Sequence, residues 1–176
     1  YAELFEAVRG LGEHTRLVVV GGHDPEKSDA LSPAVLGAAE SERVVLLGQR
    51  EDVDELYAAM DVFALASYRE GFPRSAMEAA AMGLPIVATD IRGCRQVVDD
   101  GENGLLVPAR DAGALHSALR RLVEDPGLRR RFGTAGRHRA AQRFDERRCV
   151  EIVLDTYAEV LERRRPDAGR GLRGAR

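Results

Sequence analysis

Hydrophobic positions in this chain follow two alternating spacings. Short, almost continuous apolar runs end at a glycine or a polar residue, which is typical of strands buried on both faces of a parallel sheet. Longer segments between them repeat their apolar residues every three or four positions, which is typical of helices. Strands are expected at 16–20, 43–47, 61–66, 85–89 and 105–107. Helices are expected at 1–9, 33–40, 52–60, 74–82 and 94–98, and again from 111 to 163.

The long helical stretch at 111–163 contains two breaks, at Asp125-Pro-Gly127 and at Arg143-Phe-Asp145. We therefore expect three helices there, of which the first and the last are packing helices. Apolar residues of the last one recur at helical spacing: Val150, Val153, Leu154, Tyr157, Val160 and Leu161.

Strands that alternate with helices predict an α/β fold, a Rossmann-like parallel sheet with helices on both faces. Ligands of such sheets bind at the carboxyl ends of the strands. Glycines directly after several predicted strands agree with this edge as a binding site: Gly21, Gly22, Gly48, Gly71 and Gly93.

Length and composition narrow the function classes. The chain has 176 residues, which suits one folded domain. Its net charge of -3 and its scarce aromatic residues argue against a nucleic-acid partner. The cysteines, Cys94 and Cys149, lack the spacing of a zinc site, so we expect reduced thiols and no metal. No apolar run reaches the length of a membrane span, and no signal peptide is visible at the start.

The two ends differ from the middle. The first residue is Tyr1, and helical spacing begins at once, so we expect the sequence to start inside a larger protein. Residues 163–176 are rich in arginine and glycine and lack apolar periodicity, which predicts a disordered basic tail. The expected folded domain is residues 1–162.

The segment from Tyr68 to Glu78 holds the most informative chemistry. Gly71 lets a ligand approach the main chain, and Pro73 suits the first turn of the following helix. The next backbone N–H groups, at Arg74, Ser75 and Ala76, have no partner within the helix. With the helix dipole they predict an anion site, for which a phosphate is a natural occupant.

Two acids flank this helix start. Glu78 lies among alanines and methionines and is expected to be buried, where an unpaired carboxylate would be unfavourable by several kcal/mol. Its partner is either Arg74, one turn earlier, or the hydroxyls of a sugar such as ribose. Glu70 lies in the loop at the carboxyl end of the strand; an acid there is common, but beside Glu78 and a helix start it indicates a site.

These residues resemble glycosyltransferase family 4, the retaining enzymes of the GT-B fold. The resemblance covers residues 1–162 and rests on three blocks in order: Asp61 to Pro73, Glu78 to Thr89, and Asp100 to Pro108. Within them, Glu70 and Glu78 have the spacing of the family's paired acids.

The resemblance implies roles for individual residues. Glu70 would be the catalytic acid that contacts hydroxyls of the transferred hexose, and Glu78 would bind the ribose. Gln49 and Arg50 would lie near the nucleobase. The backbone of one continuous segment, with the N–H groups of its non-proline residues, would line the sugar and diphosphate: Gly71, Phe72, Pro73, Arg74, Ser75 and Ala76. No metal or cofactor is expected, because the helix N-terminus and basic side chains would neutralise the leaving diphosphate.

For the whole protein, the resemblance implies transfer of a hexose from a nucleotide diphosphate sugar with retention, in the synthesis of cell-envelope polysaccharide or glycolipid. The acceptor would bind an N-terminal domain that this sequence lacks. Such a protein would be cytoplasmic, with peripheral association at the inner face of the membrane. In one departure from the family, Gln96 stands where a glutamate is usual.

Two alternatives stay open from the sequence. One is an α/β nucleotide-binding or assembly module without turnover. The other is a GT-B enzyme with a different reaction, such as a sugar-nucleotide epimerase.

Overall fold

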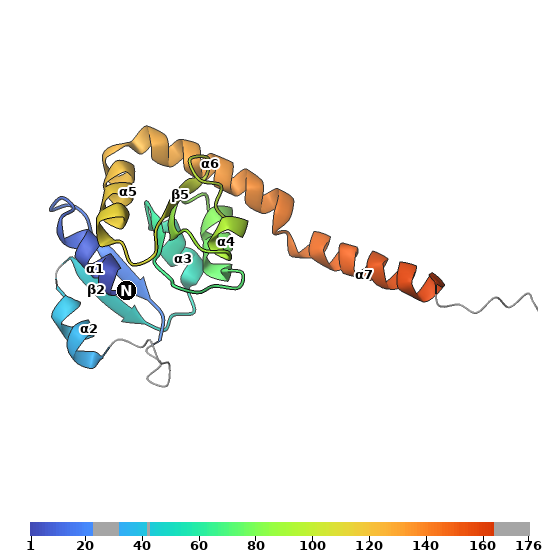
Figure 1. Cartoon of the computed structure of the whole chain (residues 1–176), viewed down its shortest axis with the longest axis horizontal. Helices are drawn as coiled ribbons and strands as arrows, with labels where there is room; N and C mark the ends of the chain where they lie inside the picture. Colours follow the sequence, from blue (N-terminus) through green and yellow to red (C-terminus); the bar gives the residue numbers. More distant parts are fainter. Residues whose placement is uncertain (23–31, 42, 164–176) are drawn as a thin grey trace, which may run out of the picture.

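The computed structural model describes residues 1–22, 32–41 and 43–163 (Figure 1). The strands are β1 (Leu17–Val20), β2 (Val44–Gly48), β3 (Phe63–Leu65), β4 (Ile86–Thr89) and β5 (Gly104–Val107). The helices are α1 (Ala2–Arg9), α2 (Pro33–Ala39), α3 (Val53–Ala58), α4 (Arg74–Ala81), a 3-10 turn η1 (Cys94–Gln96), α5 (Ala112–Glu124), α6 (Pro126–Arg143) and α7 (Glu146–Arg163). Every expected element is present, and the boundaries agree within about two residues.

All strand pairs are parallel, which confirms the α/β class, but the strands form two sheets. One holds β1 and β2, and the other has the order β3-β4-β5. Our expectation that β1 and β2 are buried on both faces is wrong: Val18 is 37% exposed. Of the described elements, these two strands contact chiefly each other, so little covers their faces.

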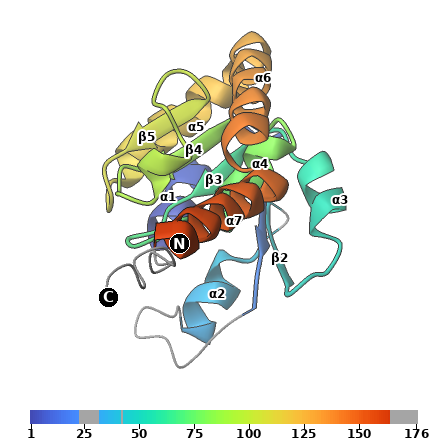
Figure 2. The ribbon, with the colours of Figure 1, turned by 90° about the vertical axis from the view of Figure 1, so that its right-hand side faces the viewer.

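The three-stranded sheet carries helices on both faces (Figure 2), as the alternation of residues on β4 shows. Val87 points into an apolar cluster with α1, α5 and the start of α6. Ile86 and Ala88 point into a second cluster, on the side of α4 and η1. Side chains of neighbouring residues in a strand face opposite sides. These strands are therefore the centre of the core.

The pair α4 and α6 packs unusually closely at two glycines. A Cβ atom on Gly133 would lie 2.0 Å from the carbonyl oxygen of Gly83, so only glycine permits this approach. Gly83 has a positive φ of 79° and ends α4, a conformation that favours glycine. The contact fixes the direction of α4 and thereby of its N-terminus.

The last helix, α7, extends away from the rest of the structure (Figure 1). None of its residues is buried, and Leu154 and Tyr157 are 60% and 64% exposed. Within the described residues no surface covers its apolar positions, so the packing expected of this helix is not made against this domain. Packing against another domain, which the family resemblance implies, stays a prediction. The tail expected at 163–176 lies outside the described residues, apart from Arg163 at the end of α7.

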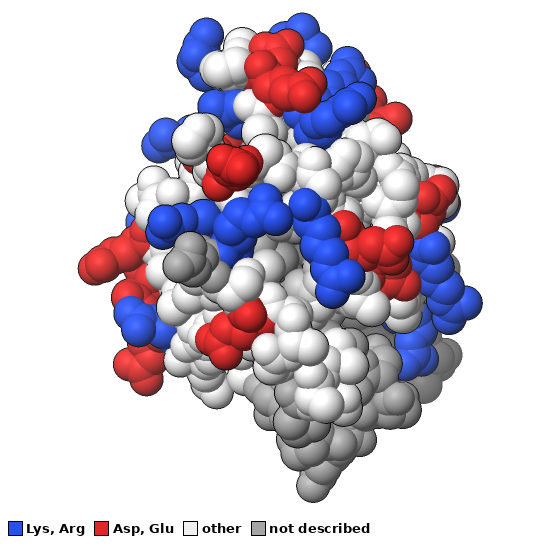
Figure 3. All heavy atoms as spheres, turned by 90° about the vertical axis from the view of Figure 1, so that its left-hand side faces the viewer, with Lys and Arg blue, Asp and Glu red and all other residues white. Residues whose placement is uncertain are grey.

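Charge is mixed over the side of the molecule that carries α1, α2 and α5. Figure 3 shows Arg interspersed with Asp and Glu over this face. Across the described part of the chain, no helix is both long and apolar enough to cross a membrane.

Candidate functional site

The site begins where β3 passes into α4 through residues 66–73, named the β3–α4 loop. Pro73 is the N-cap residue of α4 and has an extended ψ of 103°. It therefore lies just outside the first turn, whereas we had expected it within that turn. Its carbonyl oxygen accepts a hydrogen bond from the N–H of Met77. Among the hydrogen bonds of the described residues, none is donated by the amides of Arg74, Ser75 or Ala76. The amides of the two accessible residues, Arg74 and Ser75, are therefore available to an anion.

The side chains around these amides differ in accessibility. Gly71 and Arg74 are exposed, and Ser75 is half-buried. Ala76 is fully buried in the second apolar cluster, backbone included, so it presents no exposed atom to a ligand. Phe72 is 46% exposed, and its ring meets that of Phe144 edge-on, at 5.6 Å between the centroids.

Glu78 is exposed, which corrects the expectation of a buried carboxylate. α4 buries Ala76, Ala79 and Ala80, while Glu78 lies on its accessible side. In the described residues the partner of Glu78 is Tyr57, whose hydroxyl lies 3.2 Å from Oε2. The expected alternative, an ion pair with Arg74, does not form.

Tyr57 is a site residue that sequence reasoning missed. It lies on α3, is 6% exposed, and packs with Ala79 and Leu84. Its hydroxyl also lies 3.1 Å from the carbonyl oxygen of Ser75. Burial, and then the charge and hydrogen bond of Glu78, raise the pKa of Tyr57 well above its usual range. A tyrosine within an apolar helix pattern resembles any core residue, so the sequence contained no signal for this contact.

Glu70 lies half-buried at the carboxyl edge of the sheet. Its Oε1 accepts a hydrogen bond of 2.7 Å from the Ser67 hydroxyl, within the β3–α4 loop. A Cβ atom on Gly93 would lie 2.4 Å from the carbonyl oxygen of Glu70, so the segment after β4 is pressed against the Glu70 backbone. The structure therefore brings together the ends of β3 and β4, as a parallel sheet requires.

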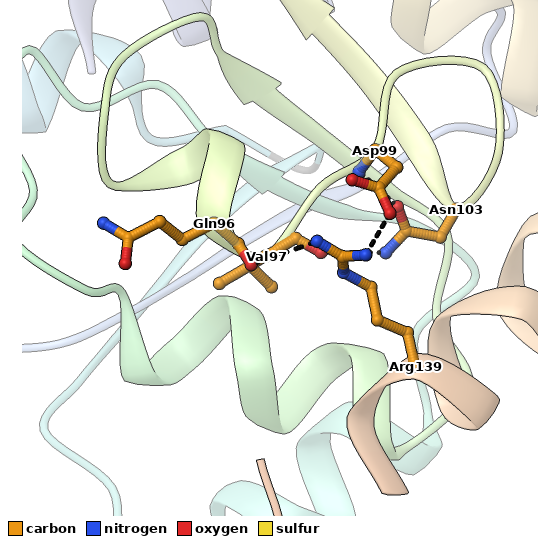
Figure 4. A network of polar contacts seen from close by, with 5 residues as sticks. All are labelled: Gln96, Val97, Asp99, Asn103 and Arg139. Atoms are coloured by element: carbon orange, nitrogen blue, oxygen red, sulfur yellow. Dashed lines mark hydrogen bonds and ion pairs between the residues drawn. The ribbon is translucent and has the colours of Figure 1, made fainter. Parts of the chain in front are cut away.

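A polar network holds the segment after β4 beside this loop. Gln96 Nε2 donates to the carbonyl oxygen of Gly71 over 3.4 Å. Arg139 of α6 pairs with Asp99 and donates to the carbonyl oxygen of Gln96 over 3.3 Å (Figure 4). Asn103, 2% exposed, accepts from the N–H of Asp99 and donates to the Val97 carbonyl oxygen. The contacts run from Arg139 of α6 to Gln96 and from Gln96 to Gly71, so α6 contributes to the position of Gly71.

Gln49 and Arg50 follow β2 and are exposed. Arg50 forms a two-pronged pair with Asp52, with distances of 2.8 and 2.5 Å. This pair lowers the pKa of the Asp52 carboxyl, chiefly through the hydrogen bond from Arg50. Asp52 is the residue before α3, and its side chain pairs with Arg50 and does not cap the helix. Among the described residues, no hydrogen bond or ion pair links Gln49 or Arg50 to α4.

An open groove of about 570 Å³ lies beside Phe72, between the segment after β4, the end of α6 and the start of α7. Its lining includes polar and basic residues, such as Gln96, Arg139 and Arg143, and apolar ones, such as Phe144 and Ile152. Within residues 1–22, 32–41 and 43–163, no group of three or more His, Cys, Asp or Glu could hold a metal ion. The absence of a metal requirement stays a prediction.

Comparisons with known proteins show the family of the chain. A family model described as Glycosyl transferases group 1 matches residues 2–125. Putative glycosyltransferase EpsD of Bacillus subtilis is 36% identical over 163 residues, which is 91% of this chain and 42% of that protein. A Campylobacter jejuni N,N'-diacetylbacillosaminyl-diphospho-undecaprenol alpha-1,3-N-acetylgalactosaminyltransferase is 34% identical, over 91% of this chain and 41% of its own length.

Solved structures show the same fold. Sucrose-phosphate synthase from Thermosynechococcus elongatus superposes with a TM-score of 0.81 and 32% identity, covering 91% of this chain and 42% of that one. Anabaena HepE in complex with UDP-glucose gives a TM-score of 0.79 and 27% identity, covering 92% of this chain and 44% of that one. The chain therefore spans less than half the length of these relatives.

Proposed function

Because the chain belongs to the group 1 glycosyltransferases, we propose that it binds the nucleotide diphosphate sugar from which a hexose is transferred. The observation that carries this proposal is the start of α4. Unpartnered amides at Arg74 and Ser75 lie on the same helix as an accessible carboxylate, at Glu78. A nucleoside diphosphate needs both groups, amides for its phosphates and an acceptor for its ribose hydroxyls.

The proposed roles follow from position. The amides of the β3–α4 loop and of the first turn of α4 would stabilise the negative charge that develops on the leaving diphosphate. Glu70, held by Ser67, would accept hydrogen bonds from hydroxyls of the hexose and is the proposed catalytic acid. Gln49 and Arg50 would approach the nucleobase. In this proposal the transfer retains the anomeric configuration and needs no metal.

The proposal for the whole protein extends further. The chain would supply the donor half, residues 1–162, of a cytoplasmic enzyme whose other domain binds the acceptor. Envelope polysaccharide or glycolipid synthesis, at the inner face of the membrane, is supported by the names of relatives. One is the Campylobacter jejuni enzyme of a diphospho-undecaprenol substrate, and another is the Staphylococcus aureus capsular polysaccharide glycosyltransferase CapM.

Calorimetry with UDP, GDP and ADP tests this function, and UDP is the first choice because HepE was solved with it. We expect one nucleotide to bind, and Glu78→Ala to weaken its binding by about 1–3 kcal/mol, through loss of hydrogen bonds to a charged group. Glu102→Ala, which removes an exposed acid on a turn, is the matched control and should bind as the unmodified chain does. Equal affinity of the Glu78 variant and the control would refute the assigned role.

A further inference from the structure

We propose that Tyr57 is a positioning residue that fixes the Glu78 carboxylate for recognition of the ribose 2′-hydroxyl. This inference rests on the proposed function. Tyr57 belongs to α3 and Glu78 to α4, so the contact between them joins two helices at the edge of the site.

The geometry gives Tyr57 two acceptors on one helix. Its hydroxyl lies 3.1 Å from the Ser75 carbonyl oxygen and 3.2 Å from Glu78 Oε2. A phenol has one proton, so the two acceptors share it. Because the tyrosine ring is buried and stacks edge-on with Phe63 at 5.9 Å, the hydroxyl is held in place. The contact therefore tethers an exposed side chain to a rigid one.

The tether leaves room for a ligand. An ionised carboxylate has about four lone-pair positions, of which Tyr57 occupies one. Within the described residues, Glu78 Oε1 accepts no hydrogen bond. The same carboxylate can therefore accept from Tyr57 and from two neighbouring sugar hydroxyls at once.

Tethering matters because an exposed glutamate is otherwise free to rotate. Binding a ligand immobilises such a side chain, and the conformational entropy that is lost weakens the affinity. A carboxylate that is already oriented avoids most of that entropy loss. The benefit applies only to a ligand that uses the carboxylate. Loss of the Tyr57 hydroxyl should thus weaken ribonucleotide binding and reduce the preference for ribose over deoxyribose.

The test compares UDP with 2′-deoxy-UDP by calorimetry on the full chain. We expect the unmodified chain to prefer UDP about tenfold, the size of a hydrogen bond to a charged group. In Tyr57→Phe the preference should shrink to about threefold, with most of the change in UDP affinity. Tyr157→Phe, which removes a hydroxyl from an exposed position on α7, is the control and should keep the full preference.

Two outcomes separate this inference from the proposed function. If Tyr57→Phe weakens UDP and 2′-deoxy-UDP equally, or leaves the preference intact, the hydroxyl serves only the packing of α3 on α4 and the inference is wrong. If the unmodified chain binds neither nucleotide, the proposed function itself fails. If Glu78→Ala keeps the preference, the ribose role of Glu78 is wrong, and the inference fails with it while nucleotide binding stands. In a Glu78→Ala background, Tyr57→Phe should change neither affinity further.

Discussion

At the residue scale, the contact between the buried Tyr57 phenol and the Glu78 carboxylate makes the free energy of unfolding depend on pH in the alkaline range. Burial and the neighbouring charge of Glu78 raise the pKa of Tyr57 in the folded chain. In the unfolded chain the phenol ionises near its ordinary value of about 10. A raised folded pKa means that the stabilisation is complete below about pH 10 and is lost as the pH rises further.

We therefore predict that the free energy of unfolding falls more steeply with pH in the unmodified chain than in Tyr57→Phe. Denaturant titrations at about pH 8 and about pH 11 measure this difference, because only the unmodified chain has the phenol that ionises on unfolding. The two chains share every other ionisable group, so the difference between their curves reports on Tyr57. Parallel curves for the two chains would show that Tyr57 keeps an ordinary pKa.

The sequence was sufficient to find the acids and the free amides but not their surroundings. The spacing from Glu70 to Glu78 and the Pro73 before a helix are local, and both could be read directly. The exposure of Glu78 could not, because the alanines around it offer no contrast between the two sides of α4. Its partner, Tyr57, lies 21 residues away and meets it only through the packing of two helices.

At the element scale, boundaries were well predicted wherever a local cap defines them. Asp111 and Asp125 accept hydrogen bonds from the N–H groups of Ala114 and Leu128, as residues that begin helices do. Pro126 follows Asp125 directly and suits a first turn. The break between α5 and α6 was therefore visible in the sequence, whereas the division of the strands into two sheets depends on contacts between distant segments.

The network around Arg139 predicts that α6 supports the segment after β4. Its guanidinium is largely buried and pairs with Asp99, whose side chain is 41% exposed. We expect Arg139→Met to lower the free energy of unfolding by about 1–3 kcal/mol, less than for a fully buried pair, because water partly screens Asp99. Chemical denaturation gives the value.

The matched control is Arg120→Met, since the pair of Arg120 with Glu124 is exposed on both sides. That variant should lose at most about 0.5 kcal/mol. Equal losses in the two variants would mean that the Arg139 network adds no more to stability than a surface pair.

At the scale of the whole molecule, α7 stands apart from the core, and stability should reflect this. Leu154 on α7 is 60% exposed, whereas Leu122 on α5 is fully buried in the first apolar cluster. We predict that Leu122→Ala lowers the free energy of unfolding by about 2–5 kcal/mol, through lost burial and a cavity. Leu154→Ala should change it by less than about 0.5 kcal/mol.

Both variants delete the same atoms, so their comparison isolates the environment. Thermal and denaturant unfolding should agree on the difference. A large loss for Leu154→Ala would mean that α7 packs in solution against a surface of the chain, and the isolated helix of Figure 1 would then be the wrong arrangement.

The division of the strands has a consequence for the energetics of ligand capture. Gln49 and Arg50 follow β2 of the two-stranded sheet, whereas Glu70 and α4 follow β3 of the three-stranded one. In the described part of the chain, no backbone ladder joins these sheets. A nucleotide that contacts both sheets would hold them in one relative position. Part of its binding free energy would then offset the entropy lost when the relative motion of the two sheets is restrained. Substitutions that pre-lock them together should then tighten binding without adding a single contact to the ligand.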